Sequence, residues 1–422
     1  MKILYLCPDF GIPVQGEKGA SVHVRELIAA FGRLGHSVVL AAPKLNKSPW
    51  EQPETLSSPL LHIPLNPEND AVVIRLKNFL EQTLGTPTSL PGELRRILYN
   101  LEAEEKLSRQ FSETPPDFIY ERAALYSTLG LSLSKKFNVP VVVELNSPLA
   151  LEQSTYRGNG FGPLAGQIEE TMLSQVDAVL TVSESLREHV MAAGIVPEKI
   201  KVFPNGVNPL VFHPGESDSK IRARLDVGKG PVLGFVGGLR PWHGVETFPL
   251  LLEQLVPRYP DLRLVIVGDG PLRATLDREL EQRSLTRHVV FPGWVGHEDV
   301  SDFIRLFDIG LAPYVPLNHT FYFSPLKLFE CMACGVPMVV PRLGQIEEVV
   351  RHGETGLLYS AGDLDGLVTA CDQLLQDVPL RRRMGQAAAK HIHDQHTWDH
   401  NATRVAELAR SLLAGRRHAQ ES

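Results

Sequence analysis

A glycine-rich turn between an apolar strand and a helix is the first segment whose residues could do chemistry. It reads Phe235-Val-Gly-Gly-Leu-Arg-Pro-Trp-His-Gly244. The carboxyl end of a parallel strand and the amino terminus of a helix both direct free N–H groups into such a turn, which favours an anion such as a diphosphate. A tight turn that binds nothing explains the same residues equally well, so this signal alone is weak.

A second helix start could also hold an anion. The segment Ser324-Pro-Leu-Lys-Leu-Phe-Glu330 places Pro325 at a predicted first helical position. The N–H groups of Leu326 and Lys327 would then have no partner within the helix and could donate to a ligand. Two such helix starts in one domain indicate a nucleotide diphosphate site more strongly than either does alone.

Several motifs of other chemistries are absent from the sequence. There is no Gly-x4-Gly-Lys-Ser/Thr loop, and no Gly-x-Gly-x-x-Gly follows a predicted strand. There is also no Gly-x-Ser-x-Gly elbow and no His-Glu-x-x-His. These absences argue against P-loop, nicotinamide or flavin, serine-hydrolase and zinc-protease chemistry.

Two groups of possible metal ligands favour structural roles. Cys331-Met-Ala-Cys334 lies in an apolar, helix-like stretch and has no second cysteine pair to complete a zinc site, so packing is the better interpretation. The late histidines lie in a charged helical stretch, where we expect an exposed polar face; they are His391, His393, His396 and His400. No metal site is predicted.

Composition places the chain among ordinary globular proteins. It has 422 residues, 43% of them hydrophobic and 22% charged, and a net charge of −7. Neither half is basic, so nucleic acid is not the expected partner. No apolar run approaches the roughly 18 residues of a membrane span, and the largest basic cluster is Arg381-Arg382-Arg383. We expect a cytoplasmic protein with no strong membrane signal.

The elements that must position these residues follow an α/β rhythm. Lys2–Cys7 is an apolar strand, and Ser37–Ala42 is a second one. Between them Val24, Leu27, Ile28 and Phe31 repeat with helical spacing. Residues 43–115 are interrupted by prolines and are expected to form an insertion with one or two helices, near 71–84 and 92–110. The rhythm then resumes with strands at 117–120, 140–145 and 178–182 and a helix at 163–176.

Further signals organise the rest of the chain. Ser185-x-x-Glu188 predicts a capping box for a helix that ends at Gly194, and Pro204-Asn-Gly206 is typical of a domain boundary. Strands are predicted at 231–236, 262–267, 288–291, 308–312, 337–341 and 357–359. Alternation of this length predicts two doubly wound, Rossmann-like α/β domains, which would face each other across a cleft at the carboxyl ends of their strands.

Eight segments in this order resemble one known family. The chain is similar over nearly its whole length to the retaining glycosyltransferases of family 4, which have the two-domain GT-B fold and use nucleotide-diphosphate sugars. The segments are Gly19-Ala-Ser-Val-His-Val24, Thr181-Val-Ser-Glu184, Pro204-Asn-Gly-Val-Asn208, Val236-Gly-Gly-Leu239, Val267-Gly-Asp-Gly-Pro271, Phe291-Pro-Gly-Trp-Val295, Leu328-Phe-Glu-Cys-Met-Ala-Cys-Gly-Val-Pro337 and Gly353-Glu-Thr-Gly356.

The resemblance implies a set of donor-binding residues. Glu330 would accept hydrogen bonds from the ribose hydroxyls, and the backbone amides of Leu326 and Lys327 would hold the diphosphate. Trp294 and Val295 would line the base, mostly through backbone contacts, although ordinary packing would explain Trp294 equally well. The other implied donor-binding positions are Gly19, Gly268, Ser324 and Pro325.

Three positions depart from the family pattern. Tyr322 stands where the first glutamate of the Glu-x7-Glu motif would be. Gly238 and His243 stand where typical members have arginine and lysine to neutralise the diphosphate. We therefore expect Arg240 and Lys327 to supply the missing positive charge. With Asn146, which falls where many members have a histidine near the transferred sugar, they form the predicted catalytic set.

The implied reaction moves a sugar from a UDP- or GDP-sugar to an unknown acceptor hydroxyl with retained configuration. The leaving phosphate would take the acceptor proton, and N–H dipoles and basic side chains would replace a metal ion, so no cofactor is expected. Residues 1–206, with a C-terminal helix at about 397–422, would form the acceptor domain, and residues 207–396 the nucleotide-sugar domain. The alternatives are a GT-B nucleotide-sugar epimerase or hydrolase, and a non-catalytic sugar-nucleotide or glycan-binding relative.

Overall fold

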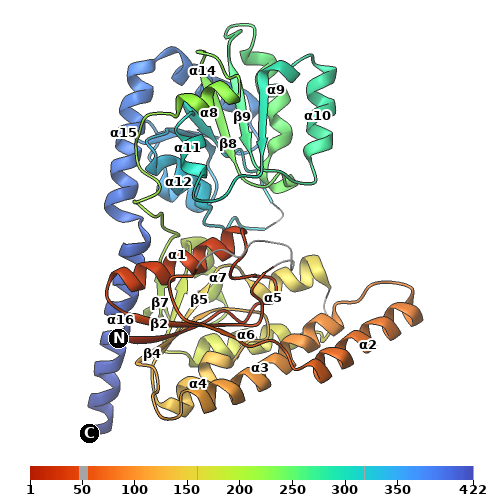
Figure 1. The fold of residues 1–422 in the computed structure, drawn as a ribbon, viewed down its shortest axis with the longest axis vertical. Coiled ribbons are helices and arrows are strands. Elements are labelled where there is room, and N and C mark those ends of the chain that lie inside the picture. Colours follow the sequence, from red (N-terminus) through yellow and green to blue (C-terminus); the bar gives the residue numbers. More distant parts are fainter. Residues whose placement is uncertain (47–55, 159, 318, 422) are drawn as a thin grey trace. The chain divides into compact units, whose positions relative to one another are not determined.

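The computed structural model describes residues 1–46, 56–158, 160–317 and 319–421. The chain forms two compact units (Figure 1). The first unit comprises Met1–Pro204 and Trp398–Ser422, and the second comprises Asn205–Thr397. The first unit therefore takes both ends of the chain. Each unit is an α/β layer structure built on one parallel sheet.

The first unit contains a seven-stranded sheet in the order β3-β2-β1-β4-β5-β6-β7, with every neighbouring pair parallel. The strands are apolar because both faces of the sheet are covered, as parallel sheets require. Their bounds are β1 Lys2–Leu6, β2 Ser37–Ala42, β3 Leu60–His62, β4 Phe118–Arg122, β5 Val141–Leu145, β6 Ala178–Thr181 and β7 Ile200–Val202.

The helices of the first unit follow the apolar periodicity of the sequence. In α1, Val24, Leu27, Ile28 and Phe31 are all buried, as predicted. The last helix, α16, packs on α1 and buries Trp398. The bounds are α1 Gly19–Arg33, α2 Pro67–Leu84, α3 Leu90–Gln110, α4 Leu129–Phe137, α5 Leu149–Glu152, α6 Leu164–Gln175, α7 Glu184–Ala192 and α16 Trp398–Glu421, with a π-helical turn at Gln153–Arg157 and a 3-10 turn at Pro197–Lys199.

Two local predictions for the first unit are corrected. The helix α7 is capped by Ser183, whose side chain accepts from the Leu186 N–H, so the predicted capping box at Ser185 is wrong. Ser183 has the extended backbone of an N-cap residue, whereas Ser185 already lies inside the helix. The short edge strands β3 and β7 were not predicted. Within the irregular region 43–115, residues 47–55 lie outside the described part of the chain.

The second unit contains a six-stranded parallel sheet in the order β10-β9-β8-β11-β12-β13. Alternate residues of β8, β9 and β12 enter two separate apolar cores, one on each face. The doubly wound α/β prediction is thereby confirmed. The strands are β8 Val232–Val236, β9 Arg263–Val267, β10 Val289–Gly293, β11 Ile309–Leu311, β12 Met338–Pro341 and β13 Gly356–Tyr359.

Helices cover both faces of this sheet (Figure 1). The predicted apolar face of α9, formed by Phe248, Leu251, Leu252 and Leu255, is buried. The helices are α8 Ser219–Arg224, α9 Phe248–Leu255, α10 Arg273–Gln282, α11 Val300–Ile304, α12 Leu326–Ala333, α13 Gln345–Val349, α14 Leu364–Gln376 and α15 Val378–Gln395, with 3-10 turns at Pro241–His243, Val245–Thr247 and Thr286–His288.

The late histidines do not form the exposed face that was predicted. His391 is buried and its ring lies 5.1 Å from that of His396, which in turn contacts Phe329 of α12. The reason is that α15 packs on α12, so a polar stretch of α15 faces a neighbouring helix. Only His400 of the four is exposed.

The cysteine pair lies in the core. Cys331 and Cys334 are free thiols buried in one of the two apolar cores of the second unit. Burial raises the pKa of Cys334 to about 12, so the thiol stays protonated near neutral pH. The pair therefore packs as small apolar side chains, as the sequence predicted.

Candidate functional site

The turn after β8 is built on close backbone contact with the turn after β9. Gly237 and Gly268 both have positive φ, at 130° and 127°. The Gly237 N–H donates to Val267 O over 2.8 Å, and a Cβ on Gly268 would run into the Gly237 carbonyl oxygen. Only glycine fits at position 268, because any side chain would push the two turns apart.

The sequence suggested that a helix begins directly after this turn. In the structure it does not. Two 3-10 turns follow Gly238, and α9 begins only at Phe248. The first residue of α9 therefore lies ten positions beyond Gly238 in the chain. Near Gly238, the groups that could hold an anion are the N–H groups of the turn and the neighbouring side chains.

Lys327 is the side chain that approaches this turn. A Cβ added to Gly237 would lie 2.7 Å from Lys327 Nζ, so the ammonium group rests against the Gly237 backbone. The Nζ atom also lies 4.2 Å from the centroid of the Phe235 ring and 5.3 Å from that of Tyr314. Lys327 belongs to α12, so this contact joins the two segments that the sequence singled out as anion sites.

The ammonium group of Lys327 is buried and has no hydrogen-bond partner among the described residues. The residue is 8% exposed, and Nζ is among the buried polar atoms that lack a partner. Burial lowers its pKa to about 7. A buried, unpaired cation is costly, and aromatic faces compensate only in part, so this position is suited to a negatively charged ligand.

Glu330 lies one turn further along α12, and its carboxylate is hydrogen-bonded to a residue outside this helix. Its Oε1 accepts from His297 Nε2 over 2.9 Å. Lys327 and Glu330 form no ion pair in the described structure, since the lysine extends toward Gly237. His297 was missed by sequence reasoning, because no local spacing links it to a glutamate 33 residues later.

The start of α12 is held by a loop that follows the first unit. Ser324 Oγ accepts from the Asn205 N–H over 2.9 Å, and the Asn205 side-chain amide donates to Ser324 O over 2.6 Å. Pro325 is the N-cap residue of α12, one position earlier than predicted, and Leu326 is the first helical residue. The helix start still presents the N–H groups of Leu326 and Lys327.

His243 and Arg240 differ in their capacity to carry charge. His243 Nδ1 donates to the Gly238 carbonyl oxygen. Burial and the nearby Lys327 lower the pKa of His243 to about 3, so its ring is neutral at physiological pH. Arg240 is exposed and stacks 5.9 Å from the centroid of the Trp242 ring. Of these two residues, Arg240 alone brings a positive charge to the turn.

The remaining predicted residues of the candidate site lie in the segments after β10 and before α12. Trp294 is 54% exposed, so its ring is not part of the core, while Val295 packs against the core. Tyr322 is buried, and its ring stacks on His319 with centroids 5.0 Å apart. Tyr322 therefore occupies an aromatic cluster and brings no carboxylate to the site.

Gly19 and Asn146 belong to the first unit. Gly19 is the first residue of α1, and Asn146 directly follows β5. The Asn146 side-chain amide donates to Glu144, whose carboxylate also accepts from His23 over 2.9 Å and from Arg122 over 2.8 Å. His23 and Arg122 hold the Glu144 pKa well below its usual range despite burial. This buried network, which the sequence did not predict, fixes the loop that carries Asn146.

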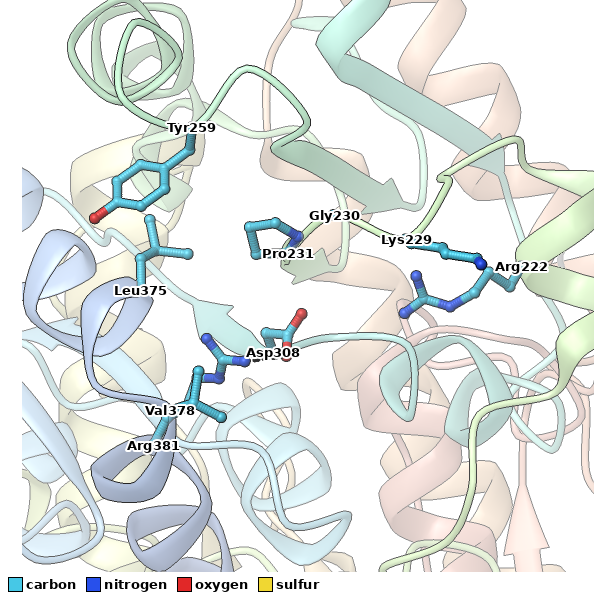
Figure 2. Close-up of a pocket in the computed structure, with 9 residues that line it drawn as sticks. All are labelled: Arg222, Lys229, Gly230, Pro231, Tyr259, Asp308, Leu375, Val378 and Arg381. Carbon is cyan, nitrogen blue, oxygen red and sulfur yellow. Dashed lines mark hydrogen bonds and ion pairs between the residues drawn. The ribbon is translucent and has the colours of Figure 1, made fainter.

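A separate cavity of 560 Å³ lies near the amino ends of the two central strands of the second sheet, β8 and β11 (Figure 2). Pro231 and Asp308 directly precede β8 and β11, so the cavity lies at the amino ends of these strands. It contains none of the predicted site residues. Its lining consists of Arg222, Lys229, Gly230, Pro231, Tyr259, Asp308, Leu375, Val378 and Arg381.

The described residues contain neither a metal-binding cluster nor a membrane-spanning helix. Within the ranges that the structure covers, no group of three or more His, Cys, Asp or Glu residues could hold a metal ion. None of the helices described above is long and apolar enough to cross a membrane.

Comparisons with known proteins identify the family. The model of "Glycosyltransferase Family 4" matches residues 18–209, and that of "Glycosyl transferases group 1" matches residues 230–377. A GDP-mannose-dependent mannosyltransferase of Mycolicibacterium smegmatis is 30% identical over 263 residues, which cover 62% of this chain and 68% of that protein. The D-inositol 3-phosphate glycosyltransferase of Acidothermus cellulolyticus is 29% identical over 318 residues, covering 72% of this chain and 69% of the relative.

Solved structures share the fold. Anabaena Alr3699/HepE in complex with UDP superposes with a TM-score of 0.74 at 21% identity, covering 97% of this chain and all of the other. The sucrose-phosphate synthase of Thermosynechococcus elongatus gives a TM-score of 0.73 at 18% identity, with 98% and 99% coverage. Together with the family models, these likenesses show that the chain belongs to glycosyltransferase family 4 and is a glycosyltransferase of the GT-B fold.

Proposed function

We propose that this glycosyltransferase moves a sugar from a UDP- or GDP-sugar to an acceptor hydroxyl, with retained configuration and without a metal ion. The observation that carries the proposal is the buried Lys327 ammonium group, which rests on the Gly237 backbone and has no partner among the described residues. A diphosphate at this turn would supply the missing negative charge.

The relatives support a nucleotide-diphosphate donor. The mycobacterial relative is named as dependent on GDP-mannose. Structures of Anabaena HepE contain UDP, UDP with glucose, or UDP-glucose. The relatives differ in their base, so we propose the donor class and leave uridine and guanosine as the two options.

The proposed chemistry needs positive charge on the leaving group. As the bond between the anomeric carbon and the diphosphate oxygen breaks, negative charge grows on the phosphate, and Lys327, Arg240 and the N–H groups at the start of α12 stabilise it. The acceptor oxygen attacks from the same face, and its proton passes to the departing phosphate oxygen. The chain's part is to bind and stabilise charge, with no nucleophile of its own.

The remaining predicted residues have proposed binding roles. Glu330 accepts from the ribose hydroxyls, and Trp294 and Val295 line the base. Gly19 is proposed to contact the donor phosphate or the acceptor, and Asn146 to lie near the transferred sugar. In this account the second unit binds the nucleotide sugar and the first unit binds the acceptor.

The test is turnover with defined donors. The chain is incubated with UDP-glucose, UDP-galactose, UDP-N-acetylglucosamine and GDP-mannose, each with and without a panel of polyols and alkyl glycosides. We expect one donor to release its nucleoside diphosphate faster when an acceptor is present, and NMR to show that the product keeps the donor's anomeric configuration. An inverted product would overturn retention. Release of free sugar or an epimer at a rate that no acceptor changes would favour a hydrolase or epimerase.

A further inference from the structure

The partner of Glu330 is an unassigned histidine, and the pair has a defined geometry. His297 lies between β10 and α11, and its Nε2 is 2.9 Å from Glu330 Oε1. The His297 side chain is 22% exposed and that of Glu330 is 8% exposed. The histidine ring also packs on Phe212, with centroids 5.2 Å apart, and Phe212 is buried in the core. A core residue therefore fixes the ring that holds the carboxylate.

We propose that His297 is a positioning residue that turns the Glu330 carboxylate toward the ribose hydroxyls of the nucleotide. The inference rests on the proposed function, because it assumes a nucleotide at Glu330. His297 lies outside the eight segments that carry the family resemblance, so they do not imply this role.

The direction of the hydrogen bond follows from the chemistry of the partners. An ionised carboxylate only accepts, so Nε2 carries the proton and donates, whether the imidazole is neutral or charged. One carboxylate oxygen is thereby occupied from the side of β10. The hydrogen bond from His297 uses Oε1, and in this proposal the second oxygen, Oε2, accepts from the ligand.

The chemistry of the ligand follows from the second carboxylate oxygen. A fixed carboxylate with a second acceptor oxygen suits a hydroxyl donor and disfavours a phosphate, which would bring like charge. A ribose offers two neighbouring hydroxyls, while a deoxyribose lacks one. Without His297 the carboxylate could rotate, and binding would have to supply the entropy of ordering it. His297 should therefore raise the discrimination between ribose and deoxyribose.

The test compares dissociation constants of UDP and GDP with those of their 2′-deoxy and 3′-deoxy forms by calorimetry. The variants are His297→Ala, His297→Gln and Glu330→Gln. The control is His213→Ala, which removes an exposed histidine of the same unit. Loss of one ordinary hydrogen bond corresponds to about two- to tenfold in affinity.

We expect the wild type to bind the ribonucleotide several times more tightly than a deoxy form. Glu330→Gln should largely abolish this ratio, His297→Ala should lower it about two- to tenfold, and His297→Gln, whose amide can still donate, should retain most of it. The control should leave the ratio unchanged.

A structural role for His297 predicts a different pattern. If His297→Ala weakens the ribo and deoxy forms equally while Glu330→Gln removes discrimination, the positioning role is overturned and the ribose role of Glu330 survives. If Glu330→Gln leaves the ratio unchanged, or if neither UDP nor GDP binds the wild type, the proposed nucleotide site and this inference both fail.

Discussion

At the scale of a single residue, Lys327 has opposite effects on stability and on ligand binding. Its buried charge lowers the stability of the ligand-free protein, and the same charge is proposed to bind the diphosphate. Its charge is buried between aromatic rings and the Gly237 backbone, and no described residue forms a hydrogen bond or an ion pair with it, although the nearby Glu330 offsets part of the cost of burial. Proteins retain such groups mainly where a function needs them, since an apolar residue of similar volume would be more stable there.

Replacing Lys327 by methionine should therefore stabilise the ligand-free protein. Removing a buried charge that has no hydrogen-bond partner is worth on the order of 1–4 kcal/mol, or a rise of roughly 2–4 °C in melting temperature per kcal/mol for a unit of this size. The measurement is differential scanning calorimetry of the second unit's transition below about pH 7, where the lysine is charged. Lys229→Met, which removes an exposed lysine, is the control and should change the transition little. A Lys327→Met protein that melts earlier than the wild type would show that the ammonium group is compensated.

The pH dependence of donor binding provides a second prediction for this residue. A bound diphosphate raises the lysine pKa above its ligand-free value of about 7. Affinity is then fully present below pH 7 and declines as the pH rises from about 7 toward the pKa of the complex. His243, with its pKa near 3, stays neutral throughout this window.

The measurement uses a nucleotide sugar, because its diphosphate has no terminal phosphate group that titrates near pH 6. We expect the decline in wild type and in Arg240→Ala, whose lost guanidinium does not titrate, and a flat profile in Lys327→Met. A wild-type profile as flat as that of Lys327→Met would contradict the assignment.

At the scale of elements, the turns after β8 and β9 depend on each other. A Cβ at Gly268 would strike the Gly237 carbonyl, and the positive φ of Gly268 adds strain for any other residue. At Gly238 a Cβ would meet its nearest atoms at 3.7 and 3.8 Å, and its φ is not positive. Two neighbouring glycines of the site are thus under different constraints.

This difference predicts opposite outcomes for two matched substitutions. Gly268→Ala should cost about 1–3 kcal/mol of unfolding free energy and weaken nucleotide binding, because it separates the two turns. Gly238→Ala should stay within about 0.5 kcal/mol of the wild type. Denaturant unfolding measures both. Equal stability of the two variants would contradict the described packing of the turns.

The sequence predicts elements where a pattern repeats and fails where a single contact decides. The buried strands and α1 follow from apolar runs and helical spacing, and the predicted ranges differ from the structure by few residues. The strands β3 and β7 have three residues each, too short for a pattern. Two serines precede Leu186, and only the extended backbone of Ser183 decides which one caps the helix.

The candidate site was predictable only in part for the same reason. Lys327 was predicted as a site residue because a lysine at a helix start is unfavourable against the helix dipole. This position can be recognised from neighbouring residues in the sequence. Its contact with Gly237 joins two residues that are 90 positions apart in the chain (327 − 237 = 90), so the sequence did not reveal it. The bonds of His297 to Glu330 and of His23 to Glu144 likewise depend on tertiary packing, which no spacing in the sequence reveals.

At the scale of the whole molecule, each unit places its candidate residues after the carboxyl ends of parallel strands. Gly237, Gly268 and Trp294 follow β8, β9 and β10, and Asn146 follows β5. Ligands of open α/β sheets bind at the carboxyl ends of the strands. The fold and the family therefore support the same general location for chemistry, and the individual residues decide how the diphosphate is stabilised.

The whole-molecule account predicts turnover in the presence of excess EDTA. Lys327, Arg240 and the α12 N–H groups are proposed to stabilise the leaving diphosphate, a task that Mg²⁺ performs in other phosphate-handling enzymes. Steady-state rates with the accepted donor should be unchanged within error by the chelator. Activity that disappears with EDTA and returns with Mg²⁺ or Mn²⁺ would count against metal-independent transfer.

The central claim is that Lys327 holds the donor diphosphate, and one calorimetric comparison tests it most directly. UDP and GDP are titrated against uridine and guanosine at about pH 6, below the Lys327 pKa of about 7, in wild type and in Lys327→Met. We predict that the diphosphate increases affinity strongly in the wild type and that the variant loses about ten- to a hundredfold of this gain, as for a hydrogen bond to a charged group. The same gain in both proteins would contradict the claim.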